Sequence, residues 1–141
     1  MTIFELVVAL TAAMILASIA VPTYSGYATR ARVARAIGDI GTITLQLYRW
    51  QLSTRDFPAT LAEAGIASND PWGRTYQYLP VAGARRGNLR KDRNLVPINT
   101  DFDLYSMGPD GLSVPPLTAA ASQDDVVRAN NGSFIGLAKD Y

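Results

Sequence analysis

The chain has 141 residues and a formal net charge of +1. This length admits one compact domain with an appendage, and the charge balance gives no reason to expect a nucleic-acid or acidic-lipid partner. Cysteine and histidine are both absent, which excludes disulfides, thiol nucleophiles and the commonest general base. Any chemistry would depend on carboxylates, hydroxyls, Lys and Tyr, and any metal would be a hard cation such as calcium.

The first predicted element is an apolar helix over residues 2–21. It reads TIFELVVALTAAMILASIAV, and Glu5 is the only charge before Arg30. About 20 helical residues span a bilayer core of roughly 30 Å, so we expect this segment to enter a membrane. The run has no basic stretch ahead of it, which argues against an ordinary cleaved signal peptide. Pro22 is expected to kink the helix or to melt it locally between residues 14 and 22.

Glu5 is the unusual residue of this segment. A carboxylate in hydrocarbon costs at least ~2.5–3.5 kcal/mol on insertion scales unless it is paired. One interpretation is that Glu5 lies near enough to the helix end to reach headgroup water. Another is that it pairs with the α-amino group of residue 1 of a neighbouring subunit, which would pack parallel helices with a stagger. The residues alone leave both open.

Residues 29–52 are predicted to continue as an amphipathic helix. Apolar side chains recur at three- and four-residue steps and would form one buried stripe, with polar side chains on the other face. The apolar positions are Val33, Ala36, Ile37, Ile40, Ile43, Leu47 and Trp50. Arg35 and Asp39 are four residues apart on the polar face, a spacing that suits an ion pair or contacts to a neighbouring subunit.

The remaining residues, 53–141, are predicted to form a small antiparallel sheet with turns and loops. Turn residues and period-two alternation mark its elements: a short helix over 59–64 ended by Gly65, a turn over 69–73, strands over 75–79 and 101–106, and a tail over 130–137 that turns and packs back on the sheet. The predicted fold is therefore α+β. It comprises an apolar, membrane-length helix (1–28) followed by a domain (29–141) in which the sheet lies across the amphipathic helix.

Three separated motifs resemble known filament proteins. Met1-Thr2-Ile3-Phe4-Glu5-Leu6, followed by an apolar stretch and Pro22, resembles the mature N-terminus of type IV pilins and type II secretion pseudopilins. Asp70-Pro71-Trp72-Gly73 with Tyr76-Gln77-Tyr78, and the later segment FDLYSMGPDG over 102–111, resemble segments of the major pseudopilins of type II secretion. The three motifs occur in the family's order and span most of the chain.

The resemblance implies a structural subunit that polymerises with copies of itself into a helical filament. A prepilin peptidase would cleave ahead of Met1 and N-methylate it, and Glu5 and Pro22 would serve assembly. The subunit would sit in the inner membrane, meet an assembly platform and minor pseudopilins there, and then enter a periplasmic or extracellular filament. The domain motifs favour a short pseudopilus, and the alternative is a long type IV pilus for adhesion, motility or DNA uptake.

The resemblance also implies a calcium site in the loop after the last predicted strand. Its ligands would be Asp110, the Met107 carbonyl and the pair Asp124-Asp125. The sequence departs from the family pattern at Leu112, near which the family often has an oxygen ligand, and in the long stretch over 114–121. The other interpretation is that Asp110 belongs to a turn and that Asp124-Asp125 cap a helix.

Other functions find less support in the residues. A basic run places five of the chain's 13 basic residues between the two predicted strands (Arg85, Arg86, Arg90, Lys91 and Arg93). We expect a solvated loop, with contacts to DNA phosphate or to acidic groups of another subunit as alternatives. Few aromatic residues interleave with it, so nucleic acid is not expected as a partner.

An enzyme would have to use carboxylates such as Asp101 and Asp103, which alternate onto one face of a strand. Nothing in the sequence indicates a cleft around them, so no catalytic role is expected. A third class, a monomeric membrane-anchored binding module, would not explain Glu5 or a methylated terminus.

Overall fold

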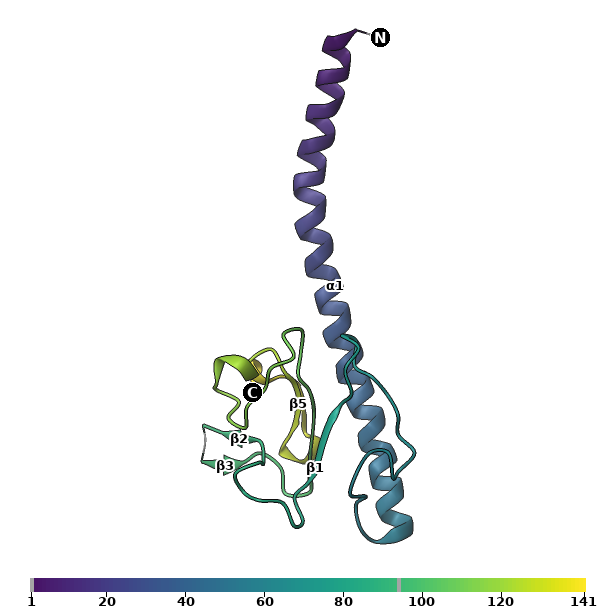
Figure 1. The fold of residues 1–141 in the computed structure, drawn as a ribbon, viewed down its shortest axis with the longest axis vertical. Helices are drawn as coiled ribbons and strands as arrows, with labels where there is room; N and C mark the ends of the chain where they lie inside the picture. Colours follow the sequence, from purple (N-terminus) through teal and green to yellow (C-terminus); the bar gives the residue numbers. More distant parts are fainter. Residues whose placement is uncertain (1, 94) are drawn as a thin grey trace. The chain divides into compact units, whose positions relative to one another are not determined.

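The computed structural model describes residues 2–93 and 95–141, with the side chains of Pro22 and Thr23 left out. The chain divides into two compact units that meet between Arg32 and Val33. The first unit consists of the N-terminal part of helix α1 (Ile3–Thr54), and the second contains the rest of α1 and all the strands (Figure 1).

The first unit is the apolar part of α1. An 18-residue window of the helix has a mean hydropathy of 2.3, and none of that window is buried within the chain. The length and composition of this helix are sufficient to cross a membrane, as the sequence predicts.

Helix α1 is unbroken through residues 14–22, in contrast to the local melting expected there. Proline removes one backbone hydrogen bond, while the Ala, Leu and Met residues that precede it favour the helix. The side chain of Pro22 is not among those that the structure describes, so the kink expected from its ring stays a prediction. The helix ends at Thr54, since Arg55 has a φ of 71°.

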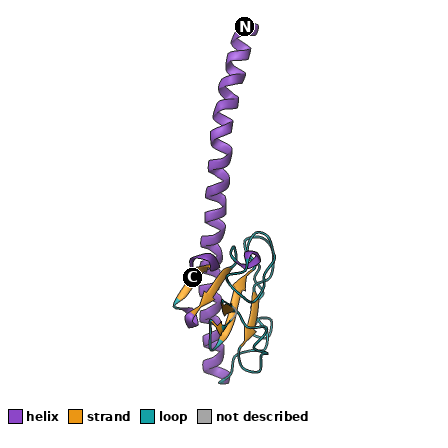
Figure 2. Ribbon diagram, turned by 90° about the vertical axis from the view of Figure 1, so that its left-hand side faces the viewer, coloured by secondary structure: helices purple, strands orange, loops and turns teal. Residues whose placement is uncertain are grey.

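In the second unit, four antiparallel strands form one sheet in the order β1-β4-β5-β6. The strands are β1 (Gln77–Pro80), β4 (Phe102–Ser106), β5 (Val126–Ala129) and β6 (Phe134–Leu137). In the predicted pairing of β1 with β4, Tyr78 lies opposite Leu104. A separate two-stranded ladder joins β2 (Lys91–Asp92) to β3 (Val96–Pro97). Figure 2 shows the orange strands beside the C-terminal part of the helix.

The C-terminal part of α1 packs on one face of this sheet. The buried helix residues are Ala36, Ile40, Ile43 and Leu47, and they share a core with Tyr76, Phe102, Leu104 and Val126. The other face carries a second cluster around Ile98, Leu117, Val127, Ala129 and Ala138. Successive strand residues point to opposite faces, which is why Val126 and Val127 enter different clusters. These contacts confirm the predicted α+β fold and the apolar stripe.

Two local predictions need correction. Residues 59–64 form a bend and a turn instead of a helix. The Gly65 N–H donates to the Ala62 carbonyl and the Ile66 N–H to the Leu61 carbonyl, the hydrogen bonds that usually end a helix. Gly65 has the positive φ (70°) expected of a C-terminal cap. The sequence also failed to predict β5, although the apolar tail does pair with the sheet as β6.

Candidate functional site

At the N-terminus, Thr2 and Glu5 hold the first turn of α1 by reciprocal hydrogen bonds. The Thr2 N–H donates to Glu5 Oε2 at 2.7 Å, and the Glu5 N–H donates to Thr2 Oγ1 at 3.3 Å. This is a capping box, which satisfies two N–H groups that a helix otherwise leaves unpaired. The spacing T-x-x-E is its usual sequence signature, so the motif could have been found by sequence reasoning. Met1, expected to be methylated, lies outside the described residues.

The second motif is a turn organised by Asp70, which is 4% exposed. Its Oδ1 accepts from the Trp72 N–H (3.0 Å) and the Arg74 N–H (2.9 Å), and its Oδ2 accepts from the Ser106 hydroxyl (2.5 Å). The tight turn is closed at Gly73, whose φ of 87° suits glycine. Ser106 belongs to the third motif, so the tertiary structure joins two motifs through residues that are 36 positions apart.

A second set of contacts completes this junction. The Arg74 guanidinium donates to the carbonyl oxygens of Gly108 (2.6 Å) and Pro109 (3.1 Å). Gly111 has a φ of 70°, and a Cβ placed on it would collide with Arg74. The second motif therefore determines the course of the loop that follows β4, which is the loop in which the calcium site is expected.

We expect Asp70→Ala to lower the free energy of unfolding by about 2–3 kcal/mol, because two backbone N–H groups and a buried hydroxyl lose their acceptor. Urea denaturation followed by tryptophan fluorescence measures this. Asp56→Ala removes a carboxylate from an exposed position and serves as the control. Equal stabilities of the two variants would contradict the proposed role of Asp70.

Three of the expected calcium ligands accept hydrogen bonds from backbone N–H groups of the chain. Asp110 Oδ1 accepts from the Leu112 N–H at 2.8 Å, and the Met107 carbonyl accepts from the Gly111 N–H at 3.2 Å. Asp124 Oδ2 accepts from the Asp110 N–H at 3.3 Å, so the loop ends do meet. Within residues 2–93 and 95–141, no three acidic side chains are grouped closely enough to hold a metal.

Asp125 fits the expected calcium set least well. Its side chain is fully buried, and its Oδ2 accepts from Arg90 Nη2 (2.5 Å) and Ser113 Oγ (2.6 Å). Burial raises the pKa of the Asp125 carboxyl to about 6, although the hydroxyl and the guanidinium act in the opposite direction. Asp124-Asp125 precede strand β5, so the alternative interpretation that they cap a helix is wrong.

The basic run is not one solvated loop. Arg85, Arg86 and Arg93 are exposed, as expected, whereas Arg90 is only 2% exposed. Arg90 is buried because Asp125 neutralises it, and that contact joins residues 35 positions apart. Sequence reasoning missed it, since a lone arginine within a basic run carries no sign of a distant partner.

Asp101 and Asp103 are both engaged by protein groups. Asp101 accepts from Arg128 and from the Tyr48 hydroxyl (2.8 Å), and Asp103 accepts from Asn99 (2.9 Å) and the Arg90 N–H (2.7 Å). Burial raises the pKa of Asp103. Burial also acts to raise the pKa of Asp101, but hydrogen bonds from Arg128, the Phe102 N–H and Tyr48 outweigh it and lower that pKa. Each carboxylate therefore serves the packing of the domain.

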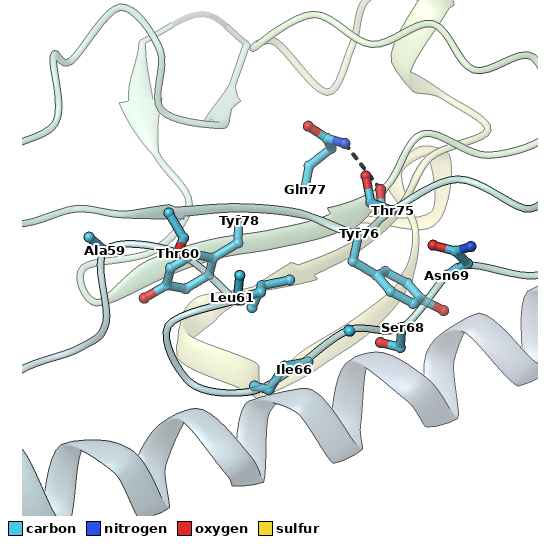
Figure 3. Close-up of a pocket in the computed structure, with 12 residues that line it drawn as sticks. Ala59, Thr60, Leu61, Ile66, Ser68, Asn69, Thr75, Tyr76, Gln77 and Tyr78 are labelled. Carbon is cyan, nitrogen blue, oxygen red and sulfur yellow. Dashed lines mark hydrogen bonds between the residues drawn. The ribbon is translucent and has the colours of Figure 1, made fainter.

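An open groove of about 640 Å³ lies between β1 and the segment 59–69. Figure 3 shows Leu61, Ile66, Tyr76 and Tyr78 among its lining side chains. The Tyr76 hydroxyl donates to Asp39 and the Tyr78 hydroxyl to the Pro58 carbonyl, both at 2.9 Å. Both tyrosine hydroxyls thus attach β1 and the residue before it to neighbouring segments of the domain. Neither hydroxyl indicates a ligand-binding site.

The raised pKa values of these two tyrosines predict a loss of stability at alkaline pH. Burial raises the pKa of Tyr78 from 10.0 to about 12 and raises that of Tyr76 as well. Over this range the unfolded chain has lost more protons than the folded chain, so the free energy of unfolding falls as the pH rises. Urea denaturation at several pH values should show this decline, and Tyr78→Phe should make it shallower. Parallel curves for the two proteins would contradict the prediction.

These features define the class of the protein. A long N-terminal helix whose C-terminal part packs on a small antiparallel sheet is a pilin-like α+β layout. The chain is 26% identical over 135 residues to the Type II secretion system core protein G of Dickeya chrysanthemi, an alignment that covers 79% of this chain and 77% of that protein. This similarity confirms the resemblance to the type II secretion pseudopilins that the motifs indicate. No family model and no solved structure matches the chain.

Proposed function

We propose that this chain is the structural subunit of a type II secretion pseudopilus and that it polymerises through its N-terminal helix. The observation that carries the proposal is the apolar surface of α1 in the first unit. Phe4, Met14 and Leu16 are 76%, 66% and 68% exposed, and every residue from 2 to 21 is exposed within the chain. A continuous apolar surface of this size requires a bilayer or a protein partner. Parallel copies of the same helix meet that requirement.

The similarity to the core protein G supports the choice of a pseudopilus. In this proposal the subunit is inserted in the inner membrane before assembly, and a prepilin peptidase N-methylates it at Met1. It then joins the filament at an assembly platform that also binds minor pseudopilins. The protein acts as a building block and not as an enzyme. In support, Asp101 and Asp103 are occupied by structural hydrogen bonds.

Immunogold electron microscopy of cells that produce the tagged protein tests the proposal. We expect labelled filaments within the envelope when the secretion ATPase is present, and labelled membrane without filaments when its gene is deleted. Long labelled surface fibres that persist without the secretion ATPase would indicate a type IV pilus instead. Dispersed membrane protein in both strains would overturn filament formation altogether.

A further inference from the structure

The loop over residues 113–125 is closed by a positively charged side chain, that of Arg90. The Arg90 guanidinium contacts oxygen atoms at both ends of this loop. Nη1 donates to Ser113 Oγ (2.5 Å) and the Val114 carbonyl (2.6 Å), and Nη2 donates to Asp125 Oδ2 (2.5 Å). The side chains of Arg90 and Asp125 are 3% and 0% exposed. One buried positive group therefore gathers three oxygens and neutralises one carboxylate.

The backbone and the guanidinium of Arg90 also contact residues outside this loop. Its N–H donates to Asp103 Oδ2 at 2.7 Å, and its carbonyl accepts from the Ile98 N–H at 3.0 Å. The guanidinium lies 4.3 Å from the centre of the Tyr105 ring, within the range of a cation–π contact. The next residue, Lys91, pairs through its backbone with Pro115 and Leu117 of the loop. The arginine thus directly precedes β2 of the two-stranded ladder, and the loop hydrogen-bonds to the residue that follows it.

A bound calcium ion performs the same task, because it collects carboxylate and carbonyl oxygens around one positive charge. Here the positive charge beside Asp125 is already present. The other oxygen of that carboxylate, Oδ1, has no hydrogen-bond partner among the described residues. A divalent ion at Oδ1 would lie within a few ångströms of the guanidinium, where two positive charges repel strongly in a buried region.

The rest of the expected ligand set points the same way. Asp110 Oδ1, the Met107 carbonyl and Asp124 Oδ2 each accept a hydrogen bond from a backbone N–H of the chain itself, those of Leu112, Gly111 and Asp110 respectively. We propose that Arg90 takes the place of a metal ion in this loop, so that the domain folds without calcium. Arg90 is the physical reason why Asp125, one member of the donor set implied by the family resemblance, does not suit a metal ion in this chain.

The first test uses the full-length protein in detergent. Thermal unfolding is followed by near-ultraviolet circular dichroism in calcium chloride, in magnesium chloride and in a calcium chelator. We expect one and the same Tm in all three conditions. A Tm that rises by more than about 4 °C in calcium alone, a shift on the scale of 1 kcal/mol of binding energy, would overturn the proposal.

The second test removes the internal cation. Arg90→Gln should lower the Tm by about 10 °C or more, because it leaves Asp125 buried without a counter-charge. The exposed Arg85→Gln is the matched control and should leave the Tm nearly unchanged. Adding Asp125→Asn to Arg90→Gln should recover part of the loss, because no unpaired charge remains. Equal effects of Arg90→Gln and Arg85→Gln would overturn the proposal, and the calcium comparison on the unaltered protein decides it if Arg90→Gln fails to fold.

Discussion

Arg128→Met is expected to lower the free energy of unfolding by about 3–5 kcal/mol, the cost of leaving one member of a buried ion pair without its partner. Arg128 is 1% exposed. Its two Nη atoms donate to both oxygens of Asp101, at 2.9 and 2.6 Å, and further bonds reach the Tyr48 hydroxyl and the Phe102 carbonyl. Methionine keeps much of the side-chain volume and removes every one of these donors.

The loss should be large because Arg128 connects three parts of the second unit. Tyr48 belongs to α1, Asp101 directly precedes β4, and Arg128 itself lies in β5. The guanidinium also lies 4.0 Å from the centre of the buried Phe102 ring. Urea denaturation followed by circular dichroism measures the change. Arg86→Met is the control for loss of one positive charge at an exposed position, and a cost similar to that of the control would show that the network contributes little.

Glu5→Ala is expected to reduce filament yield by more than tenfold, which corresponds to about 1.4 kcal/mol or more per subunit added. If the filament forms as proposed, an unpaired carboxylate would be costly among apolar helices, and the amino group of a neighbouring residue 1 would compensate it. The substitution would remove that pair. Quantitative immunoblotting of sheared or sedimented filaments, relative to total protein, measures the yield.

The capping box allows the charge of Glu5 to be separated from its local role. Glutamine also closes a capping box, so Glu5→Gln keeps the hydrogen bond to Thr2 and loses the charge. We expect Glu5→Gln to fail in assembly as Glu5→Ala does. Thr2→Val, which removes the acceptor of the 3.3 Å bond but leaves the carboxylate, should assemble. Normal assembly of Glu5→Gln together with failure of Thr2→Val would mean that Glu5 acts only on its own helix.

Much of the fold follows from patterns that are local in the sequence. The scarcity of charge before Arg30 predicts the apolar helix, and the spacing of Ala36, Ile40, Ile43 and Leu47 predicts the buried face of α1. The turn at Asp70 to Gly73 follows from residues with specific backbone preferences. These features depend on neighbours within a few positions, so sequence reasoning can identify them.

The tertiary structure alone decided which charges are buried. Arg90 and Arg128 read in the sequence as ordinary solvated residues, because removing a charge from water is costly without a partner. Their partners, Asp125 and Asp101, are 35 and 27 positions away. The same long-range pairing gives Asp125 an arginine partner, which in our proposal takes the place of the predicted metal ion. Only a folded chain brings such groups within hydrogen-bond distance, and their mutual neutralisation is what makes the burial possible.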